Sequence, residues 1–459
     1  MSVIIKNGTI VTASDMYKAD VKIEGEVITS IEASITPEKG DQVIDAAGQY
    51  VFPGGVDIHT HLDHFGTPDN FESGTMAAVA GGITTVASFV EPEKDMGILD
   101  TFKDWKNRRA KPSYIDYALV PTVTGKFSES TLEEIPALKE EGVGGLKLFL
   151  AYGHILSDVE VYKIFKKAAE YGILCHIHGE NGPVCDQMIA EAIAKGNTDP
   201  IYHGYSRITG LEAEATFRGI ALAEAANAPV RVVHVSCKEA IDVIAQAQSK
   251  GAKVLAETCP HYLTRDISYL ALPNFEGAKY VCAPPLREKE HQQHLWDAIN
   301  ANVITTVGSD HAPVCFEGEY SKQRGREAFN KIPNGCAGVE DIFSVVYHFG
   351  VHEKRISLQK FVEILCANPT KEMGLYPKKG CICIGSDADI VLLDPNKTRI
   401  ITQAKQYGKT DFNSWEGTEV HGVITHVLSR GEEVVRNGEV IGKAGRGQYL
   451  NCNNSSIFK

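Results

Sequence analysis

The chain of 459 residues has no apolar run that approaches the roughly 18 residues typical of a membrane-spanning helix. It also lacks runs rich in Lys and Arg. Its 46 basic residues are outnumbered by 59 acidic residues, which gives a formal net charge of −13. These absences argue against a membrane or a nucleic acid as the partner. No GxGxxG motif follows an expected strand and no GxxxxGK[ST] motif occurs, so nucleotide-binding folds have no support.

The chain also lacks a cysteine pattern typical of a disulfide framework. Its 11 cysteines are scattered, and several lie in apolar stretches such as 173–175. Buried free thiols are typical of a reducing compartment. Residues 1–8 lack the basic start and long apolar core of a signal peptide. We therefore expect a cytoplasmic location.

Both ends of the chain are predicted to be rich in β-strands. Short alternating runs separated by polar turns occur in 1–52 and again in 371–445. Neither end can bury two sheet faces alone, so we expect one small β-sandwich domain formed by both chain ends. The polar tail 446–459 is expected to be a mobile or intersubunit arm.

Between these ends, in 53–370, apolar strands alternate with helical patterns. The predicted strands are 50–58, 82–90, 115–123, 144–151, 173–178, 230–235, 253–258 and 303–308. Eight near-continuous apolar strands, each followed by a helix, predict a (β/α)₈ TIM barrel. An open doubly wound sheet is the alternative. The clearest helix is 158–171, for which Asp158 is the expected N-cap, Val159 begins the apolar stripe and Gly172 ends the helix.

The first barrel strand ends in two histidines. Side chains alternate along a strand, so Asp57, His59 and His61 share one face, which points inward in a barrel. Two imidazoles at this spacing can bind one divalent ion. The alternative is a pair of hydrogen-bonded core histidines. Asp57 is expected to orient a ligand.

Other predicted strands also end in potential metal ligands. His176 and His178 lie on one face of the fifth strand, His234 ends the sixth, and Asp310 follows the eighth. Such groups meet at one rim of a barrel, as a metal site requires. Alternation does not choose between His176 and His178, although His178 lies nearer the loop.

Lys147 lies inside the apolar fourth strand, where an unpaired ammonium is costly. It could pair with a carboxylate at a strand edge or form a Schiff base. A third possibility is carboxylation by CO₂, which converts the amine into an anion that can bridge two cations and offset their charge.

Several motifs together show a resemblance to a known family. They are PGGVDIHTHLD (53–63), FESGT (71–75), GGLKLFLAY (144–152), HGENG (178–182), GNTDPIYH (196–203), VVHVSC (232–237), ETCPHYL (257–263), APPLRE (283–288), TVGSDHAP (306–313), KIPNG (331–335) and KGCICIGSDADIVLLDP (379–395). Spread nearly end to end, they resemble the hydantoinase/dihydropyrimidinase family of the amidohydrolase superfamily. The resemblance implies a barrel with a split sandwich and two divalent ions, expected to be Zn²⁺, although His-rich sites also accept Mn²⁺ or Co²⁺.

The resemblance also implies a role for each ligand. His59, His61 and Asp310 would bind one metal, His178 and His234 the second, and carboxylated Lys147 would bridge the two. This choice of His178 over His176 rests on analogy.

The implied reaction opens the ring C–N bond of hydantoins or dihydropyrimidines to give N-carbamoyl amino acids. A metal-bridging hydroxide would attack the ring carbonyl, with Asp310 as the proton shuttle and Tyr152 as a donor to the oxyanion. Ala283 and Asn334 would mark the segments that hold the ring amide through backbone groups. The family usually has Ser at the position of Ala283, which a backbone contact tolerates. The loop 62–70 looks short, which affects the pocket for the exocyclic substituent.

Related functions remain as alternatives. An allantoinase-like cyclic ureide hydrolase is the nearest. A dihydroorotase is disfavoured, because Asp63 stands where that family has an Arg that holds the substrate carboxylate. A non-catalytic scaffold relative is disfavoured because all six ligand positions are filled. The resemblance also implies a homotetramer that acts on a small cyclic amide.

Overall fold

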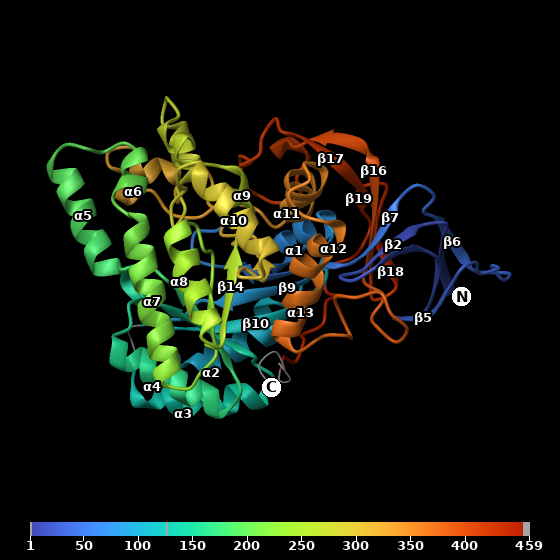
Figure 1. The fold of residues 1–459 in the computed structure, drawn as a ribbon, viewed down its shortest axis with the longest axis horizontal. Coiled ribbons are helices and arrows are strands. Elements are labelled where there is room, and N and C mark those ends of the chain that lie inside the picture. The colour runs from blue at the N-terminus through green and yellow to red at the C-terminus, as the bar shows by residue number, and fades with distance from the viewer. Residues whose placement is uncertain (1, 125–126, 453–459) are drawn as a thin grey trace.

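The computed structural model describes residues 2–124 and 127–452 (Figure 1). It contains a barrel of parallel strands and a separate pair of sheets that both chain ends contribute. Figure 1 shows the N-terminal strands in blue beside the C-terminal strands in red, on one side of the helix-covered barrel. The predicted TIM barrel with a terminal β-domain is therefore confirmed.

The barrel strands follow one another in chain order, and each pairs in parallel with the next. They are β8 (Gly55–Thr60), β9 (Ile83–Val90), β10 (Asp116–Val123), β11 (Gly145–Phe149), β12 (Leu174–His178), β13 (Val230–Val232), β14 (Val254–Thr258) and β15 (Thr306–Val307). A bridge between Thr60 and His311 joins the end of β8 to the segment after β15, and the amide of His61 donates to the carbonyl of His311 at 2.8 Å. This seam closes the sheet and excludes the open doubly wound alternative.

Helices cover the outside of the barrel (Figure 1). They are α1 (Phe71–Ala80), α2 (Ile98–Asp104), α3 (Glu129–Glu140), α4 (Asp158–Glu170), α5 (Gly182–Ala194), α6 (Ile201–Tyr205), α7 (Thr209–Ala225), α8 (Lys238–Ser249), α9 (Pro260–Thr264), α10 (Glu290–Asn300), α11 (Ile342–Val346), α12 (Leu358–Val362) and α13 (Asn368–Met373). Every residue of β8, β9 and β10 is buried, as expected for parallel strands covered on both faces.

Helix α4 shows where the prediction from periodicity was wrong in detail. Its N-cap is Ser157, not Asp158, because Ser157 and Glu160 form a reciprocal capping box. Val159 was placed in the apolar stripe but is 64% exposed, and Val161 is buried instead. Gly172 does follow the helix in a left-handed conformation, with φ +65.

The terminal domain consists of two facing sheets. The first has the order β5-β4-β1-β6, and the second has the order β19-β18-β17-β16-β7-β2-β3. Their strands are β1 (Ser2–Lys6), β2 (Thr9–Val11), β3 (Met16–Lys18), β4 (Asp20–Glu24), β5 (Val27–Glu32), β6 (Gln42–Asp45), β7 (Tyr50–Pro53), β16 (Ile390–Ile400), β17 (Glu419–Ser429), β18 (Glu432–Arg436) and β19 (Glu439–Val440). A separate apolar cluster, which includes Ile5, Val21, Val51 and Leu392, fills the space between them.

The chain passes from the terminal domain into the barrel through Gly54. A Cβ atom at Gly54 would lie 2.1 Å from the hydroxyl oxygen of Thr84, which is closer than any side chain allows. Gly54 therefore lets β7 of the sandwich continue directly into β8, the first strand of the barrel, which lies beside β9.

The described part of the C-terminal tail lies against the same chain. The amide of Tyr117 donates to Gln448, the amide of Leu450 donates back to Tyr117 at 2.8 Å, and the amide of Cys452 donates to Gly142. These contacts place 446–452 at the start of β10. The rest of the expected arm, 453–459, lies outside the described residues. Within the described ranges, no helix is long and apolar enough to cross a membrane.

A buried charge cluster joins the two parts of the molecule. The ammonium of Lys379 lies 2.8 Å from Asp116, at the start of β10, and 3.0 and 2.7 Å from Asp387 and Asp389, just before β16. All four side chains are buried. Burial disfavours the charge of Lys379, but the three carboxylates outweigh it and raise its pKa well above the usual value.

Replacing the central cation tests this junction. We expect Lys379→Met to lower the free energy of unfolding by about 3–5 kcal/mol, because buried Asp389 loses its ion-pair partner and Asp116 and Asp387 each lose one of two cations. Lys378→Met is the matched control. The Lys378 side chain is 61% exposed and also contacts Asp387, so its loss should cost less than about 1 kcal/mol. Denaturant unfolding measures both, and equal losses would contradict this assignment.

Candidate active site

The carboxyl ends of the barrel strands surround one cavity of about 260 Å³. The cavity is lined by His61, Lys147, Phe149, Tyr152, His178, His234, Ala283, Asp310, Ala312, Asn334 and Gly335. Eight of these are residues singled out from the sequence, and His59 lies directly behind His61 and Asp310. The barrel thus brings all the predicted site residues to one place.

His59, His61 and Asp310 form the first group of potential ligands. The Nε2 atoms of both histidines lie 3.0 and 3.1 Å from Oδ1 of Asp310, and the ligand atoms of all three lie within 4.8 Å of one another. Burial raises the pKa of Asp310, but the two imidazoles outweigh this effect and hold it well below its usual range. The carboxylate is therefore ionised, as a metal ligand must be.

His178 and His234 form the second group. Nδ1 of His178 lies 2.8 Å from Nε2 of His234, and Nε2 of His178 lies 2.7 Å from Oε2 of Glu180. His176, the alternative left open by strand alternation, does not line the cavity. Its Nδ1 atom instead lies 3.2 Å from the buried guanidinium of Arg231, deeper in the barrel.

The backbone at three of these residues has a left-handed conformation. His234, Asp310 and Tyr152 have φ values of 45, 48 and 65°, which non-glycine residues rarely adopt. β13 ends at Val232, before His234, so these turns and not strand alternation direct the side chains into the cavity. Strain of this kind concentrates at functional sites.

Lys147 is fully buried between two aromatic rings. Its Nζ atom lies 4.7 Å from the ring centroid of Phe89 and 5.0 Å from that of Phe149. Burial lowers its pKa from 10.5 to about 7. Within the described residues, no carboxylate forms an ion pair with this amine, so the strand-edge ion pair considered from the sequence is not found.

Two buried carboxylates, Glu257 and Asp57, bind the end of β8 that carries His59. Glu257 binds Nδ1 of His59 and also pairs with Arg231. Asp57 accepts the backbone amides of His59 and Ser309 at 3.1 Å each, so it connects the ends of β8 and β15 rather than a histidine ring. Burial raises the pKa of Asp57 to about 6.

Glu180 is a site residue that the sequence analysis missed. One of its oxygens, Oε2, accepts from Nε2 of His178, from the hydroxyl of Tyr152 at 3.2 Å and from Arg207 at 3.1 Å. Burial raises the pKa of Glu180, but Arg207 and His178 outweigh it and lower the pKa far below the usual value. Glu180 lies two residues after His178, and this spacing could have placed both side chains on the same face.

Lys322 was also missed, and no local pattern indicates it. Its buried ammonium donates to the carbonyls of Val281, Pro333 and Gly335 at 2.8 Å each. These carbonyls belong to the two loops that carry Ala283 and Asn334. Lys322 therefore holds the two loops together at the edge of the cavity.

A second cavity of about 220 Å³ adjoins the first and shares His61, Phe149, Ala312 and Asn334 with it. Phe65 and Thr67 of the loop 62–70 line it, opposite Tyr320. The rings of Phe65 and Tyr320 lie edge to face, with centroids 5.1 Å apart. The loop 62–70 therefore borders this second cavity and not the first.

The donor set fits divalent metal ions. Nδ1 of His234 is buried and makes no hydrogen bond within the described residues. The remaining donors are imidazole nitrogens and a carboxylate, which suit zinc and its neighbours in the first transition row. Cys259 and His261 also approach Asp310, but neither lines the cavity.

Comparison with known proteins agrees with this geometry. The model of the amidohydrolase family matches residues 50–434. The chain belongs to this family, and within it to the hydantoinases and dihydropyrimidinases. It is 45% identical to a D-hydantoinase of Geobacillus stearothermophilus, over 98% of this chain and 96% of that enzyme. Membership in the amidohydrolase family implies that the site binds divalent metal.

Solved structures of this family have the same fold over the whole chain. A dihydropyrimidinase from Brevibacillus agri is 44% identical and superposes with a TM-score of 0.95, over 98% of each chain. An L-hydantoinase (dihydropyrimidinase) from Arthrobacter aurescens is 30% identical with a TM-score of 0.90, over 98% of this chain and 99% of that one. Proteins with this fold are thus named both as D-hydantoinases and as an L-hydantoinase.

Glu180 offers a test of how the metal site is held. We expect Glu180→Gln to weaken binding of Zn²⁺ by about 10–100-fold, because His178 loses the carboxylate that orients its ring. Competition with a chelator measures the affinity, and circular dichroism checks that the variant is folded. Glu214→Gln is the control, since this exposed carboxylate binds the neighbouring Asn181 and not a histidine. Unchanged affinity in Glu180→Gln would contradict the orienting role.

Proposed function

We propose that the protein hydrolyses the ring amide of hydantoins and dihydropyrimidines to N-carbamoyl amino acids. The observation that carries this proposal is the convergence of four imidazoles, Lys147 and Asp310 on one rim cavity. The full-length similarity to a D-hydantoinase and a dihydropyrimidinase supports the substrate class.

The ligand roles follow from the two groups of donors. His59, His61 and Asp310 would hold one divalent ion, and His178 and His234 would hold a second. Lys147, carboxylated on Nζ, would contribute to both. The Lys147 amine lines the same cavity as these groups, and within the described residues no carboxylate forms an ion pair with it, so it is open to reaction with CO₂. We propose Zn²⁺ as the metal, because imidazole-rich sites suit it.

Bound divalent ions would supply Lewis acidity, which lowers the pKa of water from about 15.7 toward 7 and polarises a carbonyl oxygen. Asp310 accepts the proton of the attacking water and returns it to the ring nitrogen as the C–N bond breaks. Asp310 lines the cavity, and its low pKa keeps it ionised and ready to accept. The product is a single N-carbamoyl amino acid: the ring carbonyl and the water oxygen form its carboxylate, and the former ring nitrogen becomes the terminal NH₂ of its carbamoyl group.

Tyr152 is placed to stabilise the oxyanion of the tetrahedral intermediate. Burial raises its pKa well above 10, so the hydroxyl stays protonated and donates. In the structure it donates to Glu180, and it would exchange this acceptor for the substrate oxygen. Ala283 and Asn334, on the loops joined by Lys322, would hold the ring amide through backbone N–H and C=O groups.

The family resemblance also indicates the location, the assembly and the domain limits of the protein. We propose a cytoplasmic homotetramer, with a barrel over 53–370 and a sandwich over 1–52 and 371–445. Its substrate is a small cyclic amide whose exocyclic group would occupy the second cavity beside Phe65 and Tyr320.

A substrate panel tests the function. Metal-loaded protein should hydrolyse hydantoin, both enantiomers of 5-substituted hydantoins and dihydrouracil, with slower turnover of allantoin, as followed by chromatography of the carbamoyl products. Asp310→Asn should lower kcat by about 10²–10⁴-fold, because the proton acceptor is lost. Failure on every substrate would overturn the substrate class, and unchanged kcat in Asp310→Asn would remove its role.

The modified lysine has its own test. Protein prepared in ¹³C-bicarbonate should show a carbamate carbon signal by NMR, and Lys147→Ala should lack it. The variant should also lose most of its bound metal and activity, because the shared anion is gone, and added acetate or propionate should restore part of both. Lys163→Ala, an exposed lysine of α4, is the control. Full metal content and turnover in Lys147→Ala would reject the bridge.

A further inference from the structure

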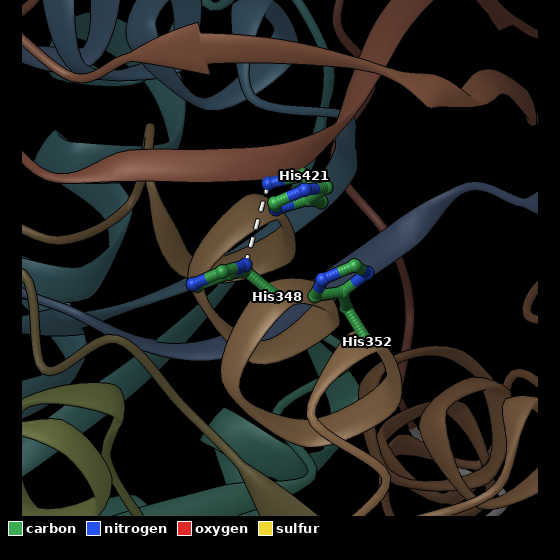
Figure 2. A group of neighbouring side chains, drawn as sticks. All are labelled: His348, His352 and His421. Atoms are coloured by element: carbon green, nitrogen blue, oxygen red, sulfur yellow. Dashed lines mark hydrogen bonds between the residues drawn. The ribbon is translucent and has the colours of Figure 1, made fainter.

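Three histidines gather outside the catalytic cavity, where the barrel meets the terminal domain (Figure 2). His348 and His352 lie four residues apart on the π-helical turn Tyr347–His352, which continues α11, and His421 lies on β17. One ligand nitrogen from each lies within 4.8 Å of the other two. None of the three lines either cavity described above.

The close approach of strand to helix creates this cluster. Gly422 follows His421, and a Cβ at Gly422 would lie 2.6 Å from two ring carbons of Tyr347. Only a glycine lets β17 lie this near to the residue before His348. The backbone amide of His421 then donates to Nδ1 of His348 at 3.3 Å, the contact drawn as a dashed line in Figure 2. The convergence is thus built into the backbone of both elements.

The three imidazole rings of the cluster lie close together. The rings of His352 and His421 are stacked with centroids 3.7 Å apart and an interplanar angle of 12°, and the ring of His348 lies 5.5 Å from each. Positive charges at these separations repel one another. Neutral imidazole is the form that binds metals.

One nitrogen of the cluster is without a partner. Nδ1 of His421 is buried and makes no hydrogen bond within the described residues. A buried polar atom in this condition indicates an absent partner, such as an ion. Nε2 of His348 faces Glu353 at 3.6 Å, so a carboxylate lies beside the cluster as a further oxygen donor. The side chain of His352 is exposed, so solvent reaches the cluster from this side.

We propose that His348, His352 and His421 form a peripheral site for a divalent transition-metal ion of the zinc type. Three imidazoles and a solvent position satisfy tetrahedral Zn²⁺, and the partly exposed location gives the ion direct access. The ion connects the helix on the barrel to a strand of the sandwich. Its role is therefore to stabilise the junction between the two domains, and it adds nothing to the hydrolytic reaction.

The test compares metal content in the intact, metal-loaded protein. After incubation with Zn²⁺ and desalting, wild type should retain one equivalent per chain more than His352→Gln or His421→Gln, as measured by elemental analysis. The affinity for this extra Zn²⁺ should fall at least tenfold in either variant. His426→Gln is the matched control, because His426 lies on the same strand but pairs with Glu433. Hydantoin turnover should be the same in all four proteins.

Thermal unfolding supplies a second readout. At a Zn²⁺ concentration about 100 times the dissociation constant, the melting temperature of wild type and His426→Gln should rise by about 3 °C relative to the two cluster variants. Equal Zn²⁺ content in wild type and the cluster variants would overturn the proposal. Because the measurement is a difference between proteins with the same catalytic centre, this result is independent of the hydrolytic function.

Discussion

The site depends on how the barrel closes at its shortest strand. β15 has two residues, and the sheet is completed by His311, which bridges to Thr60 and accepts the amide of His61. Asp57 reinforces this seam, since one of its oxygens accepts amides from both sides of it. Asp310 lies immediately before His311, so the seam itself determines how close its carboxylate comes to the histidines of β8. The spacing of these candidate ligands and the closure of the barrel therefore depend on the same row of hydrogen bonds.

Much of the fold could be predicted because its signals are strong and periodic. Apolar strands that are buried along their whole length, alternating with helical patterns, indicated eight parallel strands. The details that failed were local. The N-cap of α4 is Ser157 because the capping box with Glu160 outweighs the carboxylate of Asp158 at the next position. Val159 is exposed because only one face of α4 is buried, and Val161 lies on that face while Val159 does not.

The residues of the candidate site could also be predicted only in part. Alternation along β8 and β11 correctly directs His59 and Lys147 inward. It could not choose His178 over His176, because both point inward and only depth along the barrel separates them. His234, Asp310 and Tyr152 reach the cavity through left-handed backbone, which no strand pattern indicates. Contacts between distant segments, such as Lys322 with three loop carbonyls, depend on tertiary structure and have no signature in the local sequence.

The cluster around Lys379 has a consequence for the order in which the protein is made. Asp116 begins the third barrel strand and is buried, yet its cation is encoded far downstream, beyond the last strand of the barrel. On the ribosome, the emerging barrel holds an acidic group with no counter-charge until the C-terminal segment has left the exit tunnel. Asp116 therefore gains this counter-charge only after residue 379 has left the ribosome, and a chain truncated before that residue would keep a buried carboxylate without this partner.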